Sequence, residues 1–420
     1  MYKRSKLKNG TRVILVPMKS TKTVTVLVTV GTGSKNENEK NRGISHFLEH
    51  MFFKGTKNRP TKLDIAKELD RVGGSYNAFT GKEHTGFWAK VDSKHCGLVL
   101  DVISDMLLNS KHTQEDIDSE RGTIIEELNM FFDNPLMRIP FLFEEVLYSD
   151  NSMGQNIGGT KEIVNILQRK DFINYYKQYY TSDNIVIVVS GNFDEKNIKR
   201  KIEKYFSSIS KAKSKKQTKI TEKQNKVGIL LNYKKTDQTH LCLGVRGYRS
   251  DHKDRDVLNV LSVILGGNMS SRLSMSVVEK GLAYYIYTSP EHYKDVGYFA
   301  AQTGVNNKKC FDAIKLIIDE YKKIKEEKVS LEDLRRAKDC LKGQIVIALE
   351  SSSAVANFFA SAEMDDKKLL TPEEKFAKID AVTADDIQRV AKDIFVNDKL
   401  NLALIGPFKD TKPFKKILKF

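Results

Sequence analysis

Residues 171–193 read DFINYYKQYYTSDNIVIVVSGNF, and the chain contains this pattern a second time. At a constant offset of 215 residues, residues 386–408 read DIQRVAKDIFVNDKLNLALIGPF and align without a gap. In both copies a helical pattern leads through a turn into an apolar run that ends at glycine. The five identical pairs are Asp171/Asp386, Lys177/Lys392, Asp183/Asp398, Gly191/Gly406 and Phe193/Phe408. The repeat predicts two copies of one domain.

The elements around the first copy indicate the fold class. Two stretches rich in β-branched residues, 12–17 and 22–34, predict strands, and the spacing then becomes helical at 44–53. Longer helices are expected over 94–108 and 114–132. This order predicts an α+β protein with two homologous α/β-sandwich domains, each a mostly antiparallel sheet with helices packed on one face.

A lysine-rich stretch separates the two copies. Seven lysines and one acid, Glu222, lie between Ser207 and Lys226, and the stretch has no helical apolar period. We predict a Lys-rich linker at 209–225 between an N-terminal domain, 1–208, and a C-terminal domain, 226–420. The alternative is a surface for an anionic partner. Stacking aromatics and groove-reading motifs are missing there, so nucleic acid is not the expected partner.

Composition narrows the class of protein further. The 420 residues carry a formal net charge of +16, with 40% hydrophobic residues. The four cysteines show no CxxC spacing, which argues against a disulfide scaffold or a cysteine-ligated zinc. No apolar run approaches the roughly 18 residues of a membrane span, and the N-terminus lacks the pattern of a signal peptide. We therefore expect a cytoplasmic protein with no membrane partner.

The motif His46-Phe47-Leu48-Glu49-His50 indicates a metal site. On a helix, residues i and i+4 share a face, so His46 and His50 can present both imidazoles to one ion. Glu49 lies at the edge of that face. Bound zinc lowers the pKa of its water to about 7, and a nearby carboxylate can take that proton. The alternative is a helix with two polar histidines beside its core face.

A catalytic zinc needs a third protein ligand and an open fourth position. Glu120, Glu126 and Glu127 lie on one predicted helix. Glu120 and Glu127 are seven residues apart and share a face, whereas Glu126 points about 100° away from Glu127.

HFLEH followed by this ERxxIxxE-like frame resembles the pitrilysin or insulinase family, in the single-unit branch that includes mitochondrial processing peptidase and bacterial processing-type proteases. The similarity extends to GISHFLEHMFFKGT (43–56), GGSYNAFTGKEHT (73–85), LGGNMSSRL (265–273) and GLAY (281–284). The resemblance implies that His46, His50 and Glu127 bind one Zn²⁺ per chain. It also implies that Glu49 is the general base and that Glu120 supports the site.

Two further stretches gain a role from the resemblance. Residues 75–80 read as an ordinary edge strand, but the family holds substrate on the equivalent strand, which implies contacts from Asn77, Ala78 and Phe79. Tyr284 matches a family tyrosine that contacts the substrate carbonyl from the opposing unit. The accompanying family arginine has no match at its usual spacing, so either Arg272 or Lys280 replaces it or the contact with that carbonyl is weakened.

The function implied is a zinc metalloendopeptidase that hydrolyses peptides or unfolded polypeptides inside a closed chamber. One chain would form half of a clamshell, as a homodimer or as a heterodimer with a paralogous chain. The rival interpretation is a non-catalytic assembly subunit, since the same fold serves in inactive partner chains that have lost the motif. This chain keeps all four residues of the metal and base set, which favours the enzyme.

Overall fold

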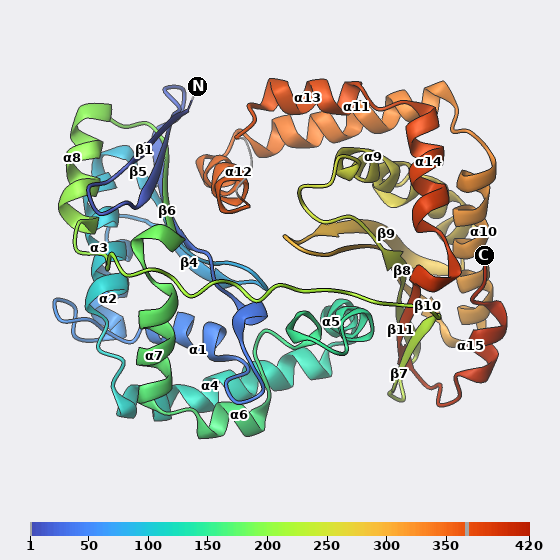
Figure 1. Ribbon diagram of the computed structural model, residues 1–420, viewed down its shortest axis with the longest axis horizontal. Helices are drawn as coiled ribbons and strands as arrows, with labels where there is room; N and C mark the ends of the chain where they lie inside the picture. Colours follow the sequence, from blue (N-terminus) through green and yellow to red (C-terminus); the bar gives the residue numbers. More distant parts are fainter. Residues whose placement is uncertain (1, 366–368) are drawn as a thin grey trace. The chain divides into compact units, whose positions relative to one another are not determined.

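The computed structural model describes residues 2–365 and 369–420 and divides into two compact units. Unit 1 comprises residues 1–129, 156–218 and 347–369, and unit 2 comprises 130–155, 219–346 and 370–420. Each unit holds one sheet with helices packed against it, so the α+β fold with two sandwiches is confirmed (Figure 1).

The sheet of unit 1 has six strands in the order β1-β2-β6-β3-β5-β4. Every neighbouring pair is antiparallel except β2 and β6, which run parallel. Strand β4 lies at one edge and pairs only with β5 among the described strands. In chain order the strands are β1 (Lys3–Lys6), β2 (Arg12–Pro17), β3 (Thr23–Val30), β4 (Ser75–Thr80), β5 (Thr85–Asp92) and β6 (Ile185–Gly191).

The sheet of unit 2 repeats this arrangement without a counterpart of β1. Its order is β7-β11-β8-β10-β9, with β7 and β11 parallel and the other pairs antiparallel. Val186 opposes Arg12 in unit 1, and Asn401, 215 residues after Val186, opposes Gly228 in unit 2. The internal repeat therefore extends to strand order and register. The strands are β7 (Gly228–Tyr233), β8 (Gln238–Arg246), β9 (Ala283–His292), β10 (Gly297–Asn306) and β11 (Leu400–Gly406).

Helices cover both faces of the sheet in unit 1. Side chains alternate between faces along a strand, so a sheet whose successive residues are all buried needs cover on each side. Strand β6 is such a strand, since all seven of its residues are buried. Helix α12 packs Val355 and Phe359 against one face, which includes Leu27 and Val188. The other helices of this unit are α1 (Ile44–Met51), α2 (Lys62–Asp70), α3 (Cys96–Asn109), α4 (Gln114–Asp133, to residue 129), α6 (Lys161–Ile166), α7 (Arg169–Tyr179) and α8 (Glu195–Phe206), and α12 spans Ser352–Met364.

Unit 2 is also covered on both faces. Helix α5 packs Ile139 and Phe143 against a face that includes Cys242 and Ile405. Arg246 fastens the end of α5, since its guanidinium donates a hydrogen bond to the carbonyl of Leu147. The helices of this unit are α5 (Pro135–Leu147), α9 (Arg255–Gly266), α10 (Cys310–Glu326), α11 (Leu331–Ala348, to residue 346), α13 (Pro372–Asp380), α14 (Ala384–Ile394) and α15 (Lys412–Ile417).

The compact units and the sequence halves differ by two exchanged helices. Helix α5 comes from the first half of the chain but belongs to unit 2, and α12 comes from the second half but belongs to unit 1. Local patterns did not indicate this exchange, because the apolar face of a helix does not show which sheet it will cover. The sequence predicts helices on one face of each sheet. In the structure, an exchanged helix covers the other face as well.

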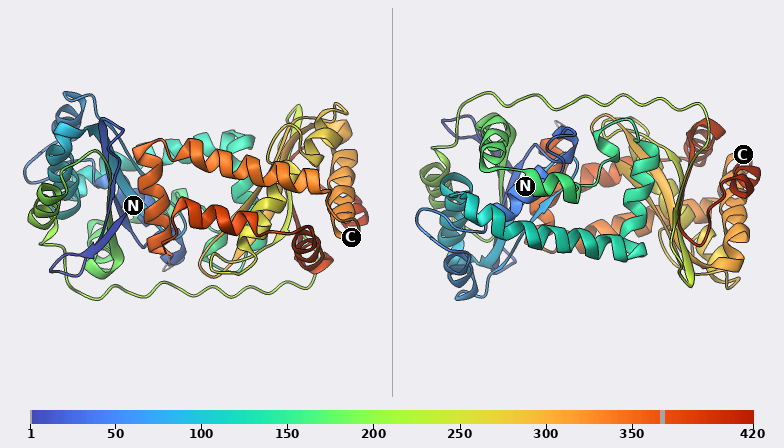
Figure 2. Two further views of the ribbon diagram at one scale, coloured as in Figure 1. Left: turned by 90° about the horizontal axis from the view of Figure 1, so that it is seen from above. Right: turned by 90° about the horizontal axis from the view of Figure 1, so that it is seen from below.

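The lysine-rich stretch between the two copies contains no helix or strand and is drawn as an extended segment (Figure 2). It is nevertheless hydrogen-bonded to unit 1. The side chain of Gln217 donates to the carbonyl of Gly31 at 2.8 Å, and the amide of Lys215 donates to the carbonyl of Gln178 at 2.9 Å.

Within the described residues, no single helix is long and apolar enough to cross a membrane. Helices α11 and α12 reach that length and hydropathy only when they are counted together as one broken span.

Candidate active site

Helix α1 places both histidines of the motif side by side. The ring centroids of His46 and His50 are 4.7 Å apart, as expected for residues four apart on one helix face. On its other side α1 buries Phe47, Leu48 and Met51 in the core of unit 1. Packing of these apolar residues fixes the rotation of the helix, and the two imidazoles therefore face α4.

Helix α4 supplies the third candidate ligand, Glu127. One carboxylate oxygen lies 3.7 Å from Nε2 of His46, and the other lies 3.5 Å from Nε2 of His50. The three ligand atoms lie within 4.8 Å of one another, and they form the one candidate metal cluster among the described residues. Ligand atoms roughly 2.0–2.2 Å from a shared zinc must approach one another this closely. The donor set and its spacing fit zinc.

The protonation state of His46 suits a metal ligand. Burial, with a smaller contribution from the nearby His50, lowers the pKa of this imidazole to about 4. A neutral imidazole keeps a lone pair for a metal ion. Its Nδ1 is buried and has no hydrogen-bond partner among the described residues, so the ring is held by packing.

Glu126 and Glu127 differ in placement although they are adjacent. Glu126 is exposed, and the side-chain amide of Asn129 donates to it at 3.4 Å. Glu127 is partly buried and faces the two histidines. The 100° rotation per residue of a helix separates the two carboxylates.

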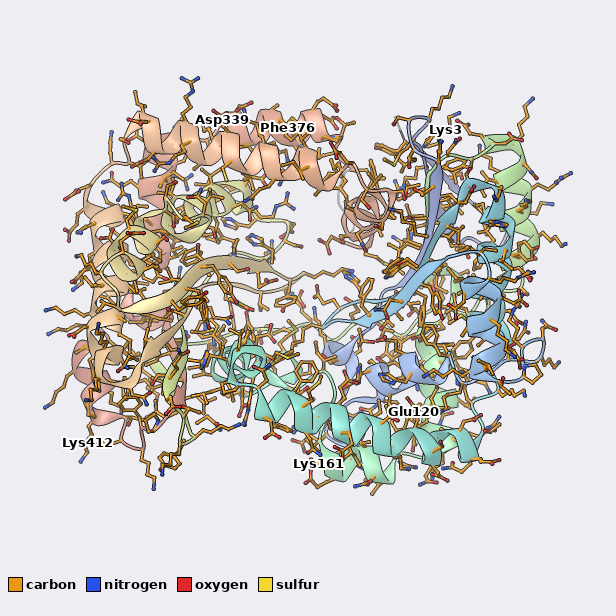
Figure 3. The ribbon with its side chains drawn as sticks, turned by 180° about the vertical axis from the view of Figure 1, so that it is seen from behind. Lys3, Glu120, Lys161, Asp339, Phe376 and Lys412 are labelled. Carbon is orange, nitrogen blue, oxygen red and sulfur yellow. The ribbon has the colours of Figure 1, made fainter. Side chains whose placement is uncertain are left out.

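Glu120, which is labelled in Figure 3, lies two helical turns before Glu127 and contacts His50. Its Oε1 lies 3.0 Å from Nδ1 of His50, and Nζ of Lys54 donates to its Oε2 at 2.6 Å. Burial alone would raise the pKa of Glu120, but the hydrogen bonds from His50 and Lys54 lower it to about 2. The ionised carboxylate accepts from Nδ1–H of His50, which leaves the Nε2 lone pair directed at the cluster.

Lys54 had no role in the sequence-based expectation. It lies four residues after His50, just beyond the end of α1. The spacing of four from a ligand histidine was the available signal.

Glu49 lies between the metal cluster and strand β4. It is buried, and burial raises the pKa of its carboxyl group, while a hydrogen bond from Thr80 and the nearby His50 oppose that rise. The hydroxyl of Thr80, the last residue of β4, donates to Oε2 of Glu49 at 2.5 Å. Thr80 was also missed from the sequence, because only the folded sheet brings the end of β4 to α1.

The expected substrate contacts lie on two faces of the edge strand β4. Ala78 shares the face of Thr80, because side chains alternate along a strand, whereas Asn77 and Phe79 lie on the other, exposed face. The ring of Phe79 lies across Gly86 on β5, where an added Cβ would be 2.3 Å from the ring. A larger residue at Gly86 would displace this ring.

Tyr284 and both candidate replacements for the family arginine belong to unit 2. Tyr284 lies in β9 with 88% of its surface exposed. Arg272 is partly buried, with Nη2 3.8 Å from a carboxylate oxygen of Asp333, and Lys280 is exposed. Tyr284 therefore has a side chain free to contact another molecule.

Comparison with known proteins agrees with the fold. Residues 12–161 match the family "Insulinase (Peptidase family M16)", and residues 167–341 match "Peptidase M16 inactive domain". The zinc protease YmxG of Bacillus subtilis is 35% identical over 97% of this chain and 98% of its own length. A zinc protease of Streptomyces coelicolor is 32% identical over 97% of this chain and 90% of its own.

Solved structures show the same fold. A protease from Helicobacter pylori superposes with a TM-score of 0.91 at 25% identity, covering 97% of this chain and 99% of that one. A chain from complex III of Candida albicans superposes with a TM-score of 0.86 at 17% identity and covers all of both chains. At that identity the second likeness concerns the fold alone.

The duplicated α+β architecture and the relatives named zinc proteases identify a zinc protease of the type with one repeat pair per chain. The chain belongs to the insulinase family, peptidase family M16.

Proposed function

We propose that this chain is a zinc-dependent endopeptidase in which Glu49 is the general base. The observation that carries the proposal is the position of Glu49. This buried carboxylate has a raised pKa and adjoins the cluster of His46, His50 and Glu127. A zinc ion held by the three ligands would supply Lewis-acid activation of water and of the scissile carbonyl.

The protein's own groups then move the proton. Glu49 takes a proton from the attacking water and passes it to the nitrogen of the leaving amine. Its raised pKa brings this group closer to neutral pH, where such exchange is most efficient. Thr80 holds one carboxylate oxygen and leaves the other free to accept the proton.

The substrate class follows from the edge strand. Strand β4 has a free edge beside the base, and an extended peptide can add to it through main-chain hydrogen bonds that tolerate many sequences. Such binding requires an unfolded segment, so the proposed substrates are peptides and unfolded polypeptides. Ala78 on the side of the base, and Asn77 and Phe79 on the other side, are the proposed contacts.

We further propose that two chains pair around a closed chamber, as a homodimer or with a paralogous chain. The exposed Tyr284 would contact the substrate carbonyl in the site of the partner. One zinc would be bound per chain. Native mass measurement with metal analysis of the same sample tests this arrangement, and a metal-free monomer would contradict it.

Replacement Glu49→Gln tests the proposed base. The variant should bind zinc as the wild type does and lose at least about 1,000-fold in cleavage of an unstructured peptide, since the amide cannot accept the proton. The matched control is Glu126→Gln, which makes the same change at an exposed carboxylate and should remain active. Cleavage by Glu49→Gln at the wild-type rate would refute the assignment.

A further inference from the structure

A buried carboxylate, Glu37, lies at the N-terminal end of α1. Its Oε2 accepts a hydrogen bond from the amide of Gly43 at 2.7 Å, and its Oε1 accepts one from the amide of Ser45 at 2.8 Å. The first amides of a helix have no partner within the helix, and negative charge is favourable there. Glu37 thus supplies a cap to the helix that carries His46 and His50.

The geometry at Gly43 explains why the cap comes from outside the helix. Caps are ordinarily provided by Ser, Thr, Asp or Asn at the position before the first helical residue. Gly43 occupies that position with φ +88°, and a Cβ there would lie 2.5 Å from the carbonyl oxygen of Gly158. No capping side chain fits at residue 43, so Glu37 serves in its place.

Burying the carboxyl group of Glu37 has an energetic cost, which its hydrogen bonds to α1 must offset. Only 5% of Glu37 is exposed, and burial raises the pKa of its carboxyl group to about 7, while the hydrogen bonds from Ser45 and Gly43 oppose the rise. A buried carboxylate is costly unless it is fully hydrogen-bonded. Nothing in the proposed chemistry of Glu49 uses Glu37.

The segment that carries Glu37 is fastened to the sheet. It follows the 3₁₀ turn η1 (Ser34–Asn36), and the amide of Lys35 donates to the carbonyl of Lys82 at 2.8 Å. The ammonium of Lys35 pairs with the carboxylate of Glu83 at 2.6 Å, with both side chains buried. Glu37 therefore connects α1 to the turn between β4 and β5.

Helix α7 adds a second fastening. The hydroxyl of Tyr175 lies 2.7 Å from Oγ of Ser45 and 2.7 Å from Oγ1 of Thr32. Ser45 is thus held through its amide by Glu37 and through its side chain by Tyr175. The next residue along the chain is His46.

We propose that Glu37, with Ser45 and Tyr175, is a positioning group that sets the zinc affinity by fixing α1 in place. The inference rests on the zinc site proposed above. An eight-residue helix is not stable alone, so its position depends on such anchors. A metal site requires its ligands to be held within about 0.5 Å of their productive positions. A loosened α1 would move two of the three ligands together relative to Glu127.

Replacement Glu37→Gln tests this proposal, because the side chain keeps its size but loses one of two acceptors. Competition with a chromophoric chelator should show zinc affinity reduced about 10- to 100-fold. The visible spectrum of the cobalt(II)-loaded protein should also change, since it reports ligand geometry. The control is Glu39→Gln in the same loop, whose side chain is 88% exposed and which should bind zinc as the wild type does.

Equal zinc affinity and equal cobalt spectra in the wild type, Glu37→Gln and Glu39→Gln would overturn the inference and leave the proposed function standing. Failure of the wild type to bind zinc would instead overturn the proposed function. Should Glu37→Gln not fold, Tyr175→Phe removes only the hydroxyl that contacts Ser45 and Thr32. A smaller rise in melting temperature on adding zinc would then support the inference, and an unchanged rise would refute it.

Discussion

Polar side chains that hydrogen-bond to the ligands and to the base fix the orientation and the charge of these residues. His50 is oriented by Glu120, which Lys54 keeps ionised, and Glu49 is held by Thr80. Partners of this kind hold ligand orientation and basicity, so their loss affects the metal or the chemistry without removing a ligand.

Alanine substitution of two neighbouring glutamates tests whether Glu127 is the third zinc ligand. Glu127→Ala should strip most of the zinc, because it removes one of three protein ligands. Glu126→Ala should leave zinc content unchanged, since that side chain is exposed on another face of α4. Metal analysis after dialysis measures both, and equal zinc content in the two variants would mean that Glu127 is not a ligand.

The hydroxyl of Thr80 is tested by two small changes. Thr80→Val preserves shape but removes the donor to Glu49, and we expect turnover to fall roughly 10- to 100-fold with zinc content unchanged. Thr80→Ser keeps the hydroxyl and should restore most of the rate. If the valine and serine variants are equally active, the hydrogen bond has no part in catalysis.

At the scale of elements, the exchanged helices complete the sheets. Helix α12 buries Phe359 against the sheet of unit 1 and also bonds the strands through Ser352, whose hydroxyl lies 2.8 Å from Oγ1 of Thr25. Arg4 and Arg12 both pair with the buried Glu363 near the end of the helix. These contacts make α12 part of the core of unit 1.

Phe359→Ala measures that contribution. The variant should lower the free energy of unfolding by about 3–5 kcal/mol, the usual cost of emptying a buried phenylalanine site. Asn357→Ala, on the exposed side of the same helix, should change stability by less than about 0.5 kcal/mol. Denaturant titration distinguishes the two, and similar losses would show that α12 is not packed as described.

At the scale of the whole molecule, the exchange joins the two halves of the chain independently of the linker. The first half contributes α5 to unit 2, and the second half contributes α12 to unit 1. Separating the halves would uncover an apolar sheet face in each unit. Such exposure costs roughly 25 cal/mol for each Å² of apolar surface.

A chain divided at the linker should therefore remain assembled. Residues 1–211 and 212–420, produced together as two polypeptides, should copurify with the zinc content of the intact chain, because the break lies at exposed residues. Phe359→Ala introduced into the second piece should weaken their association. Elution of the two pieces as separate species would refute the idea that helix exchange holds the halves together.

Local patterns were enough to predict the duplication, the α+β class and the shared face of His46 and His50. These depend on spacing along the chain: a repeat offset of 215 and a separation of four on one helix. Such spacings can be read from the sequence because the geometry of a helix or a strand is fixed. The choice of Glu127 as the third ligand came from the resemblance to the insulinase family.

Only the tertiary structure decided which sheet each of α5 and α12 covers, and which groups stand behind the ligands. Lys54, Thr80 and Glu37 reach their partners through packing of separate elements. An apolar helix face matches any apolar sheet face, and a carboxylate accepts from any donor within reach. The partner is chosen by the packing of the folded chain, and no local pattern records that choice.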